Sequence, residues 1–354
     1  ADDWIEIYNA TDFDVDMGGM YIADDQDIWR IPAGYSTQTT VRAKGYIVFW
    51  ADNEEETEGP LHLSFKLGAG GDSITLYDTD GVTPVDTVTF GSQIWNVSYG
   101  RYPDAANDWY FFDDPSKGAE NDHAGVANRV EDTSFYPDRG FYDAPFEVTI
   151  ETNTPGATIY FTTDGSDPIG ADGSPTVAAQ TYAVSNKPYI TTTTCLRAAA
   201  VKSGYLSTNI DTHTYIFLND VLQQPVLPAG YPATWPGGTY SGSVTGDYQV
   251  DPDIVNHAVQ TNRLITTHLR SLPTICVVMN RNDWFQSGRG LYVTQALDGT
   301  EYRCSFEYFD PDGDGRSIQQ NVAVAMAGGV TGGGTSLDRW KSYKLSMRPR
   351  FKTQ

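Results

Sequence analysis

The chain has 354 residues, 40% of them hydrophobic and 19% charged, so it is long enough for two or three folded domains and too apolar for a disordered protein. Its net charge of −23 is concentrated at the N-terminus, because residues 1–130 hold 24 acids and 7 bases (net −17) and the remaining residues hold 22 and 16 (net −6). Phosphate-binding surfaces need clustered Lys and Arg, so nucleic acid and anionic membranes are excluded as partners of the acidic third.

The spacing of the cysteines and the length of the apolar runs argue against a disulfide-rich, a C-x-x-C metal-binding or a membrane-spanning protein. Cys195, Cys276 and Cys304 are odd in number and widely spaced, so they predict no disulfide framework and no C-x-x-C metal site. No run approaches the ~18 apolar residues of a membrane span. The chain opens directly with a strand-like segment and shows no signal peptide, so we expect it to be cut from a longer precursor.

Short strands separated by turn residues fill the first third of the chain. The alternation from Leu61 to Leu67, for example, has the period of two that is typical of a strand with one buried face. We predict an all-β sandwich, with strands at Trp4–Tyr8, Met20–Ala23, Ile28–Ile31, Tyr46–Trp50 and Leu61–Leu67, and a hairpin of Ser73–Tyr77 and Val85–Phe90 around the turn Asp78–Gly81.

A polar segment at 113–133 reads as a linker to a second β-unit, Phe135–Phe217. Within that unit Ile159–Thr163 is β-branched and aromatic, and the Asp-Gly and Asp-Pro pairs that follow end the strand. The later strands are expected at Ile190–Ala200 and Thr212–Phe217.

The last third of the sequence predicts both helix and strands. Gln223–Asp253 is rich in Pro and Gly and should be an extended connector. Asp253–Leu269 is the best helix candidate, with Asp253 as its cap. We predict strands at Thr274–Met279, Leu291–Thr294, Tyr302–Phe309, Asn321–Ala327 and Tyr343–Met347, with a glycine-rich loop at Gly328–Gly334 before the last.

Each unit resembles a known family. Asp3–Asn9, Met17–Asp25 and Val97–Arg101 resemble motifs of the lamin tail domain, which implies an immunoglobulin-like module over residues 1–117. Tyr142–Ile150, Tyr160–Pro168 and Leu196–Ala200 are similar to the chitobiase/hexosaminidase C-terminal module, an accessory immunoglobulin-like domain usually carried by secreted bacterial proteins.

The third resemblance implies a different activity. Leu272–Met279, Gly288–Tyr292, Ser305–Asp310 and Lys341–Leu345 resemble the start of the spore coat protein H kinase-like family, an atypical kinase family that phosphorylates secreted proteins. In that family Ser-Arg directly follows the glycines, whereas Thr335–Arg339 intervenes here, and the metal-binding acids lie beyond the position of Gln354. ATP and Mg²⁺ are therefore expected only if a complete kinase domain exists, with Gly332, Gly333, Gly334, Lys341 and Lys344 as candidate nucleotide-binding residues.

The predicted fold class is mainly β, with two immunoglobulin-like β-sandwiches in tandem followed by a partial α+β domain. The predicted boundaries are a lamin-tail-like sandwich at 1–117, a linker at 118–134, a chitobiase-C-terminal-like sandwich at 135–218, a connector at 219–252 and a truncated kinase-like region at 253–354.

Three groups of side chains are candidate binding sites. Asp310, Asp312 and Asp314 resemble half of a calcium loop, although the twelfth position is Asn321 where a bidentate Glu is needed, which favours a tight turn. Two acidic groups are either cation ligands or solvated surface, namely Asp12, Asp14 and Asp16 on one expected strand face and Asp24, Asp25 and Asp27 in a loop. Trp109 and Tyr110 are either core or an exposed glycan-contact patch.

The interpretation that these patterns favour is a non-catalytic secreted or cell-surface fragment that acts as a spacer, adhesion or glycan-contact scaffold. Its expected partner is a polysaccharide or a surface protein, and the oligomeric state stays open. Two alternatives are the N-terminal portion of an extracellular kinase and the accessory region of a polysaccharide-degrading enzyme. The residues present predict no catalytic constellation, so an atypical kinase is expected only of a longer protein.

Overall fold

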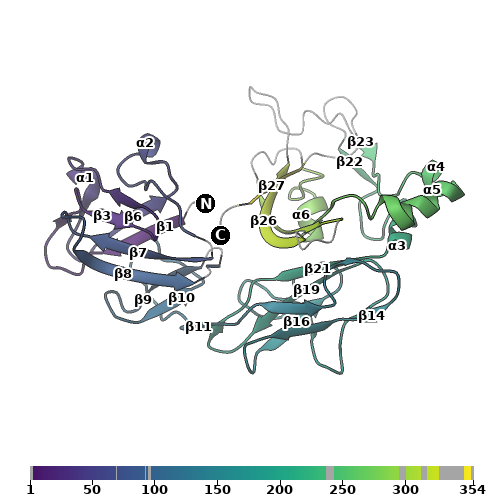
Figure 1. The fold of residues 1–354 in the computed structure, drawn as a ribbon, viewed down its shortest axis with the longest axis horizontal. Helices are drawn as coiled ribbons and strands as arrows, with labels where there is room; N and C mark the ends of the chain where they lie inside the picture. The colour runs from purple at the N-terminus through teal and green to yellow at the C-terminus, as the bar shows by residue number, and fades with distance from the viewer. Residues whose placement is uncertain are drawn as a thin grey trace. The chain divides into compact units, whose positions relative to one another are not determined.

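The computed structural model describes residues 3–68, 70–91, 93–94, 97–236, 243–294, 300–311, 317–326 and 347–351. Short β-strands dominate these residues, and the helices among them are short (Figure 1). The described chain divides into two compact units. The first runs to Arg129 and includes Gly204–Leu206, and the second contains Val130–Ser203 and the described residues from Ser207 onward. No helix of the described residues is long and apolar enough to cross a membrane.

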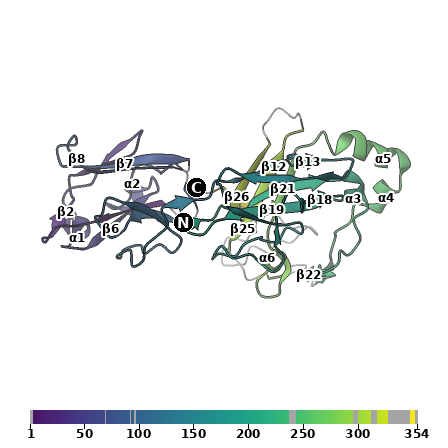
Figure 2. The same cartoon turned by 90° about the horizontal axis from the view of Figure 1, so that it is seen from below.

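The first unit is built from short strands and two single-turn helices. The strands are β1 Asp3–Tyr8, β2 Val15–Asp16, β3 Tyr21–Ala23, β4 Ile28–Arg30, β5 Thr40–Val41, β6 Tyr46–Ala51, β7 Gly71–Tyr77, β8 Pro84–Gly91, β9 Ser98–Arg101, β10 Trp109–Phe112, β11 Asn128–Arg129 and β20 Tyr205–Leu206, and the helices are α1 Ser36–Thr39 and α2 Glu55–Glu58. One layer is the sheet β4-β3-β7-β8, and the facing layer contains the antiparallel pairs β1–β6 and β2–β5 (Figure 2). The pairs β9–β10 and β11–β20 complete the unit.

The core of the first unit lies between these layers. Alternate residues of β6 point inward, so that Ile47, Phe49 and Ala51 are buried while their neighbours are half-buried. Phe49 meets Trp29 of β4 edge-on, with ring centroids 6.3 Å apart. Full burial of one such side chain contributes about 1.5–3 kcal/mol, so the inward-facing residues of β6 help to hold the two layers together.

The predicted hairpin is confirmed, and one predicted strand is wrong. Strands β7 and β8 pair antiparallel around Asp78–Gly81, where Gly81 has a φ of +71° that favours glycine. Leu61–Leu67 forms only isolated bridges at His62 and Lys66, although Leu63 and Phe65 are buried as the alternation requires. The burial pattern was thus correct, but the segment bonds to β6 only around Trp50 and lacks a continuous ladder.

Residues 113–129, which follow β10, belong to the first unit and pack against its strands. Phe111 and Val126 exchange both backbone hydrogen bonds at 2.9 Å. The Gly118 N–H donates to the carboxylate of Glu6, and the Lys117 ammonium lies 4.1 Å from the centroid of the Trp50 ring. Much of the segment expected to be a linker is therefore fixed against the first sandwich.

The second unit contains a second sandwich and a C-terminal sheet. The sandwich strands are β12 Thr133–Tyr136, β13 Gly140–Phe141, β14 Phe146–Glu147, β15 Thr149–Thr152, β16 Thr158–Thr162, β17 Gln180–Thr181, β18 Tyr189–Ile190, β19 Thr194–Val201 and β21 Asp211–Ile216. One sheet has the order β13-β21-β19-β16-β17, and the pairs β12–β15 and β14–β18 form the other side. The C-terminal sheet is antiparallel, with the order β24-β25-β26-β27, and consists of β24 Thr274–Val278, β25 Tyr302–Phe309, β26 Ile318–Met326 and β27 Met347–Arg350.

Strand β21 is covered on both faces. All six of its residues are buried, whereas a strand with one solvated face buries alternate residues. On the inner face, the His213 ring stacks on Phe135 of β12 at 4.0 Å. On the outer face, Thr214 bonds to Glu307 of β25. The C-terminal sheet therefore packs on the outer face of the second sandwich, which the sequence did not predict.

The predicted helix at Asp253–Leu269 is interrupted, and its predicted cap is wrong. The Asp251 side chain accepts the Asp253 N–H at 2.9 Å, so Asp251 caps the segment and Pro252 takes the first helical position. The segment consists of α4 Pro252–Val255, α5 Ala258–Arg263 and the π-helix η1 Leu264–His268. The other elements of this region are α3 Leu218–Leu222, α6 Arg281–Phe285, β22 Thr234–Pro236 and β23 Ser243–Thr245.

Of the strands predicted near the C-terminus, three are confirmed, one is a turn, and one lies mostly outside the described residues. The predictions at Thr274–Met279, Tyr302–Phe309 and Asn321–Ala327 are confirmed as β24, β25 and β26 with small shifts of their ends. Leu291–Thr294 is a turn, in which Val293 and Thr294 donate back to the Gly290 carbonyl. The glycine-rich loop and residues 343–346 lie outside the described residues.

Candidate functional site

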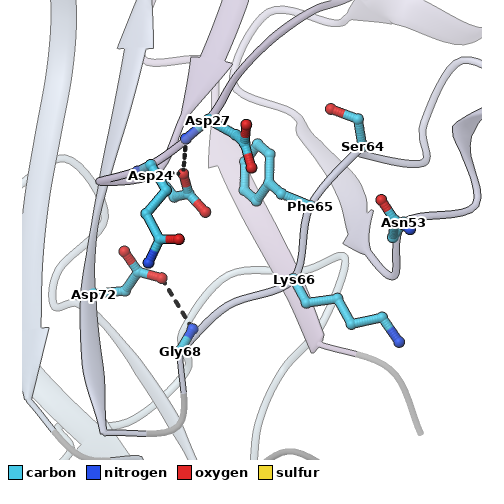
Figure 3. A pocket seen from close by; sticks show the side chains of 9 residues that line it. Asp24, Asp27, Asn53, Ser64, Phe65, Lys66, Gly68 and Asp72 are labelled. Atoms are coloured by element: carbon cyan, nitrogen blue, oxygen red, sulfur yellow. Dashed lines mark hydrogen bonds between the residues drawn. The ribbon is translucent and has the colours of Figure 1, made fainter.

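Three carboxylates meet beside an open pocket of the first unit. Asp24, Asp25 and Asp72 each offer an oxygen, and these oxygens lie within 4.8 Å of one another. The adjacent pocket has a volume of about 340 Å³, and Figure 3 shows Asp24 and Asp72 on one side of it with Lys66 on the other. Phe65 forms part of the lining.

Local hydrogen bonds orient two of these carboxylates. Asp24 directly follows β3. Its Oδ1 accepts the backbone N–H of Gln26 at 2.9 Å and that of Asp27 at 2.5 Å (Figure 3). Asp72 lies near the start of β7, where its Oδ2 accepts the Gly68 N–H at 2.9 Å (Figure 3). Since β3 and β7 are paired, the turn after β3 comes beside the start of β7.

This donor set suits a hard cation. Ca²⁺ prefers carboxylate and carbonyl oxygens and tolerates flexible geometry. The sequence suggested Asp24, Asp25 and Asp27 as cation ligands. In the structure the first two lie close to Asp72, and Asp27 lines the pocket. Asp72 was missed because only the β3–β7 pairing brings it close, and a single acidic residue before a strand gives no signal.

The other acidic candidates do not form a site among the described residues. Asp12 pairs with Lys44 at 3.1 Å, Asp14 accepts the Ala43 N–H at 2.9 Å, and Asp16 accepts the Thr39 hydroxyl at 2.6 Å. The bond from Thr39 lowers the pKa of Asp16. Each carboxylate thus has its own partner, and only Asp16 belongs to a strand, which corrects the expected shared face.

Two predicted sites fall largely outside the described residues. Asp310 is described, and its N–H donates to the Ser317 hydroxyl at 3.0 Å, but Asp312 and Asp314 are not described. Gly332, Gly333, Gly334, Lys341 and Lys344 are also outside the described residues. The calcium-loop and nucleotide-binding assignments therefore stay predictions.

Trp109 and Tyr110 are consecutive residues of β10 and so point to opposite sides of the strand. The Trp109 ring stacks on Tyr99 at 5.4 Å, and the Arg101 guanidinium lies 4.6 Å from its centroid. Both aromatic residues are half-buried. They do not share one flat platform, and their assignment as glycan contacts stays a prediction.

A more exposed aromatic pair lies on the second sandwich. Tyr136 of β12 is 78% exposed and Tyr189 of β18 is 63% exposed. Tyr136 lies opposite Thr149, and Tyr189 lies opposite Glu147. Glu147 ends β14 and Thr149 begins β15, on either side of the buried Val148, so all four side chains share the outer face. The Lys187 ammonium donates to the Thr149 hydroxyl at 3.0 Å on the same face.

We name this surface the tyrosine face; its residues are Tyr136, Glu147, Thr149, Lys187 and Tyr189. Two strand spacings of about 4.8 Å and an offset of two residues along the strands place the two tyrosines roughly 11–12 Å apart. The sequence reasoning missed both residues because the nearby core positions are equally aromatic. The only available signal was their place in the period-two pattern, next to the half-buried Phe135 and the buried Ile190.

Cys276, Cys304 and His62 are packed or paired within the fold. All three thiols are free, and burial raises the pKa of Cys276 and of Cys304 to about 12, so both stay protonated and poorly nucleophilic at neutral pH. His62 pairs with Asp52 at 2.6 Å. These side chains make pairs and packing contacts of the fold.

Comparison with protein families agrees with this architecture. Residues 1–92 match the family model of the Lamin Tail Domain, and residues 137–212 match that of the Chitobiase/beta-hexosaminidase C-terminal domain. The chain carries two immunoglobulin-like β-sandwich domains in tandem. We call them the lamin-tail module and the chitobiase-type module. Domains of these kinds occur in carbohydrate-active enzymes or surface proteins.

Searches of the curated proteins and of the solved structures each found no significant match. Neither family match extends to residues 225–354, so the kinase-like resemblance has no support from them. The boundaries proposed for the linker, the connector and the last region stay predictions.

Proposed function

We propose that this chain is a non-catalytic scaffold of a secreted or cell-surface protein, and that its chitobiase-type module contacts a neutral polysaccharide through the tyrosine face. The observation that carries the proposal is the pair of exposed tyrosines on one sheet face of a module from a carbohydrate-related family. An exposed apolar patch with a polar rim marks a contact site, whereas a single exposed apolar side chain does not, so it matters that the two tyrosines share one face.

The chemistry of the tyrosine face suits an uncharged sugar chain. Each Tyr offers an apolar ring for the C–H face of a pyranose and a hydroxyl for its polar edge. Thr149, Lys187 and Glu147 supply a hydroxyl, a donor and an acceptor between the rings. With one Lys and one Glu the face carries no net charge, which favours a neutral polymer over an anionic one.

Chitin oligosaccharides are the first probe, since the name of the matched domain refers to chitobiase and β-hexosaminidase. Isothermal titration of the whole chain with chitohexaose is expected to show binding, and cellohexaose serves as a second neutral chain. Tyr136→Ala and Tyr189→Ala should each weaken binding roughly tenfold, which corresponds to about 1.4 kcal/mol.

Tyr35→Ala is the matched control, because Tyr35 is a comparably exposed tyrosine of the lamin-tail module. It should leave the affinity unchanged. Equal affinity of the wild type and the Tyr136→Ala, Tyr189→Ala double variant would contradict the assignment to this face. Failure of both oligosaccharides to bind would contradict the neutral glycan ligand.

A second candidate function rests on the carboxylates of the lamin-tail module. We propose that Asp24, Asp25 and Asp72 bind Ca²⁺, because three carboxylate oxygens within 4.8 Å repel one another unless a cation neutralises them. Ca²⁺ should raise the melting temperature of the wild type, and Asp72→Asn should remove most of that rise. Glu56→Gln, an exposed acid of α2, should retain the full rise. An equal rise in Asp72→Asn and the wild type would contradict the site.

A further inference from the structure

A buried group of charged side chains joins the chitobiase-type module to the C-terminal sheet. Glu307 of β25 has no exposed surface. Its Oε1 accepts the backbone N–H of Thr214 at 3.0 Å, and its Oε2 accepts the Thr214 hydroxyl. The side chain of Asn321 on β26 adds a second link, donating to the Ile210 carbonyl at 3.1 Å. The two sheets are thus connected by polar bonds as well as by packing.

Arg139 connects Glu307 to the inner side of the module. Its Nη1 lies 3.5 Å from Glu307 Oε1, and its Nη2 lies 2.8 Å from His213 Nε2. Glu307 meets the outer face of β21, and the His213 ring lies on the inner face. The guanidinium therefore bridges the two faces at the strand's edge, where β13 begins at Gly140.

The position of Arg139 determines the tautomer of His213. A guanidinium only donates, so His213 Nε2 must be the acceptor and the ring proton must lie on Nδ1. Nδ1 lies 3.1 Å from Asp138 Oδ1, a charge contact without hydrogen-bond geometry. The ring is buried and stacks on Phe135, with an angle of 17° between the planes, so it has little room to reorient.

A second proton on this ring has no acceptor. It would occupy Nε2 and place two donors, the imidazolium and the guanidinium, face to face at 2.8 Å. Arg139 would then have to move, and Glu307 would lose its cation while still buried. A buried charge without its partner destabilises a fold by about 3–5 kcal/mol.

We propose that His213 and Arg139 form an acid-sensitive latch, in which protonation of His213 displaces Arg139 from Glu307 and loosens the C-terminal sheet from the chitobiase-type module. The charged and titratable groups around the ring are Asp138 and Arg139 before β13, Tyr142 after it, Glu307 of β25, and Asp211 and Tyr215 of β21. The neighbours on β12 and β19, Phe135 and Leu196, carry no charge.

The direction of the effect follows from burial. Burial lowers the pKa of His213 below its ordinary 6.5, so the fold favours the neutral ring. That contribution is fully present above pH 6.5 and is lost as the pH falls toward the folded-state value. Burial also raises the pKa of Glu307 and of Asp211, and these two groups act in the opposite direction, favouring the fold as the pH falls.

Hydrogen exchange of the whole chain at pH 7 and pH 5, corrected for the intrinsic rate, tests the latch. From pH 7 to pH 5, protection of β21 and β25 should fall in the wild type relative to His213→Gln, because this comparison cancels the opposing effects of Asp211 and Glu307. His213→Gln keeps an acceptor for Arg139 but cannot take a proton, so its protection should hold or rise at pH 5. His123→Gln, at an exposed histidine of the first unit, should behave as the wild type. Identical pH responses of His213→Gln and the wild type would overturn the proposal.

Nitrogen-15 NMR of the wild-type imidazole gives a test that needs no variant. The latch requires the Nδ1–H tautomer of His213 at neutral pH, and protonation of its ring should coincide with shifts in the Glu307 region. The Nε2–H tautomer, or a ring that titrates while the β25 resonances stay fixed, would contradict the latch.

Discussion

Glu307 joins the C-terminal sheet to the chitobiase-type module. It is a charged side chain with no exposed surface, and it accepts from both donors of Thr214 while lying 3.5 Å from Arg139. Buried charges are tolerated when they are paired and fully bonded. Here the partners come from segments far apart in the sequence, so no local pattern predicts the arrangement.

Removal of Glu307 should therefore be costly. Glu307→Ala leaves the Thr214 N–H and the Arg139 guanidinium without their acceptor, and we expect a loss of about 3–5 kcal/mol in the free energy of unfolding. Glu307→Gln keeps an acceptor and should lose about 1–3 kcal/mol. Urea denaturation measures both, with the exposed Glu151→Ala as a control near zero. A Glu307→Ala variant as stable as the control would show that the contact contributes nothing.

The buried carboxyl of Asp211 should make the fold less stable as the pH rises. Burial raises its pKa to about 6, and bonds from Thr133 partly oppose that rise. Its contribution to stability is present below pH 3.8 and is lost as the pH rises through 6. Relative to Asp211→Asn, the wild type should lose roughly 2.4 kcal/mol between pH 4 and pH 7. Urea midpoints at both pH values measure this difference, and a pH-independent gap would contradict it.

At the scale of elements, the sequence predicted strands well where local pattern decides them. Tyr302–Phe309 and the hairpin at Asp78–Gly81 carry their own alternation or turn residues, and both were confirmed. Leu61–Leu67 had the correct buried face but no ladder, because pairing depends on a partner strand. The cap at Asp251 was missed although Asp followed by Pro is an N-terminal signal.

The segment after β10 packs closely against that strand at Gly125, so a larger side chain at this position should destabilise the fold. A Cβ there would lie 2.4 Å from the Phe111 carbonyl oxygen and 2.9 Å from the Tyr110 Cβ. Gly125→Ala should therefore separate Val126 from Phe111 and destabilise the lamin-tail module by roughly 1–3 kcal/mol. Gly91→Ala is the control, since a Cβ there meets no atom within 4 Å. Equal melting temperatures of the two variants would contradict the close packing.

At the scale of the whole molecule, the family resemblances predicted two sandwiches in tandem, and these are present. What they did not predict is that the chitobiase-type module is covered by the C-terminal sheet through β21 and β25. The binding surfaces were also beyond the sequence. Asp72 joins Asp24 only through strand pairing, and Tyr136 and Tyr189 share a face only because β12 pairs with β15 and β18 pairs with the preceding strand, β14. Local sequence patterns predict which face of a strand is buried, whereas the pairing of distant strands determines which side chains lie side by side.

Native mass spectrometry of the intact chain with chitohexaose tests the central claim, a scaffold that holds a polysaccharide and does not cleave it. The account predicts complexes of the chain with the intact oligosaccharide, no shortened product after prolonged incubation, and loss of the complexes in the Tyr136→Ala, Tyr189→Ala double variant. Shortened oligosaccharides, whose formation is abolished by changing one side chain of this chain, would contradict it.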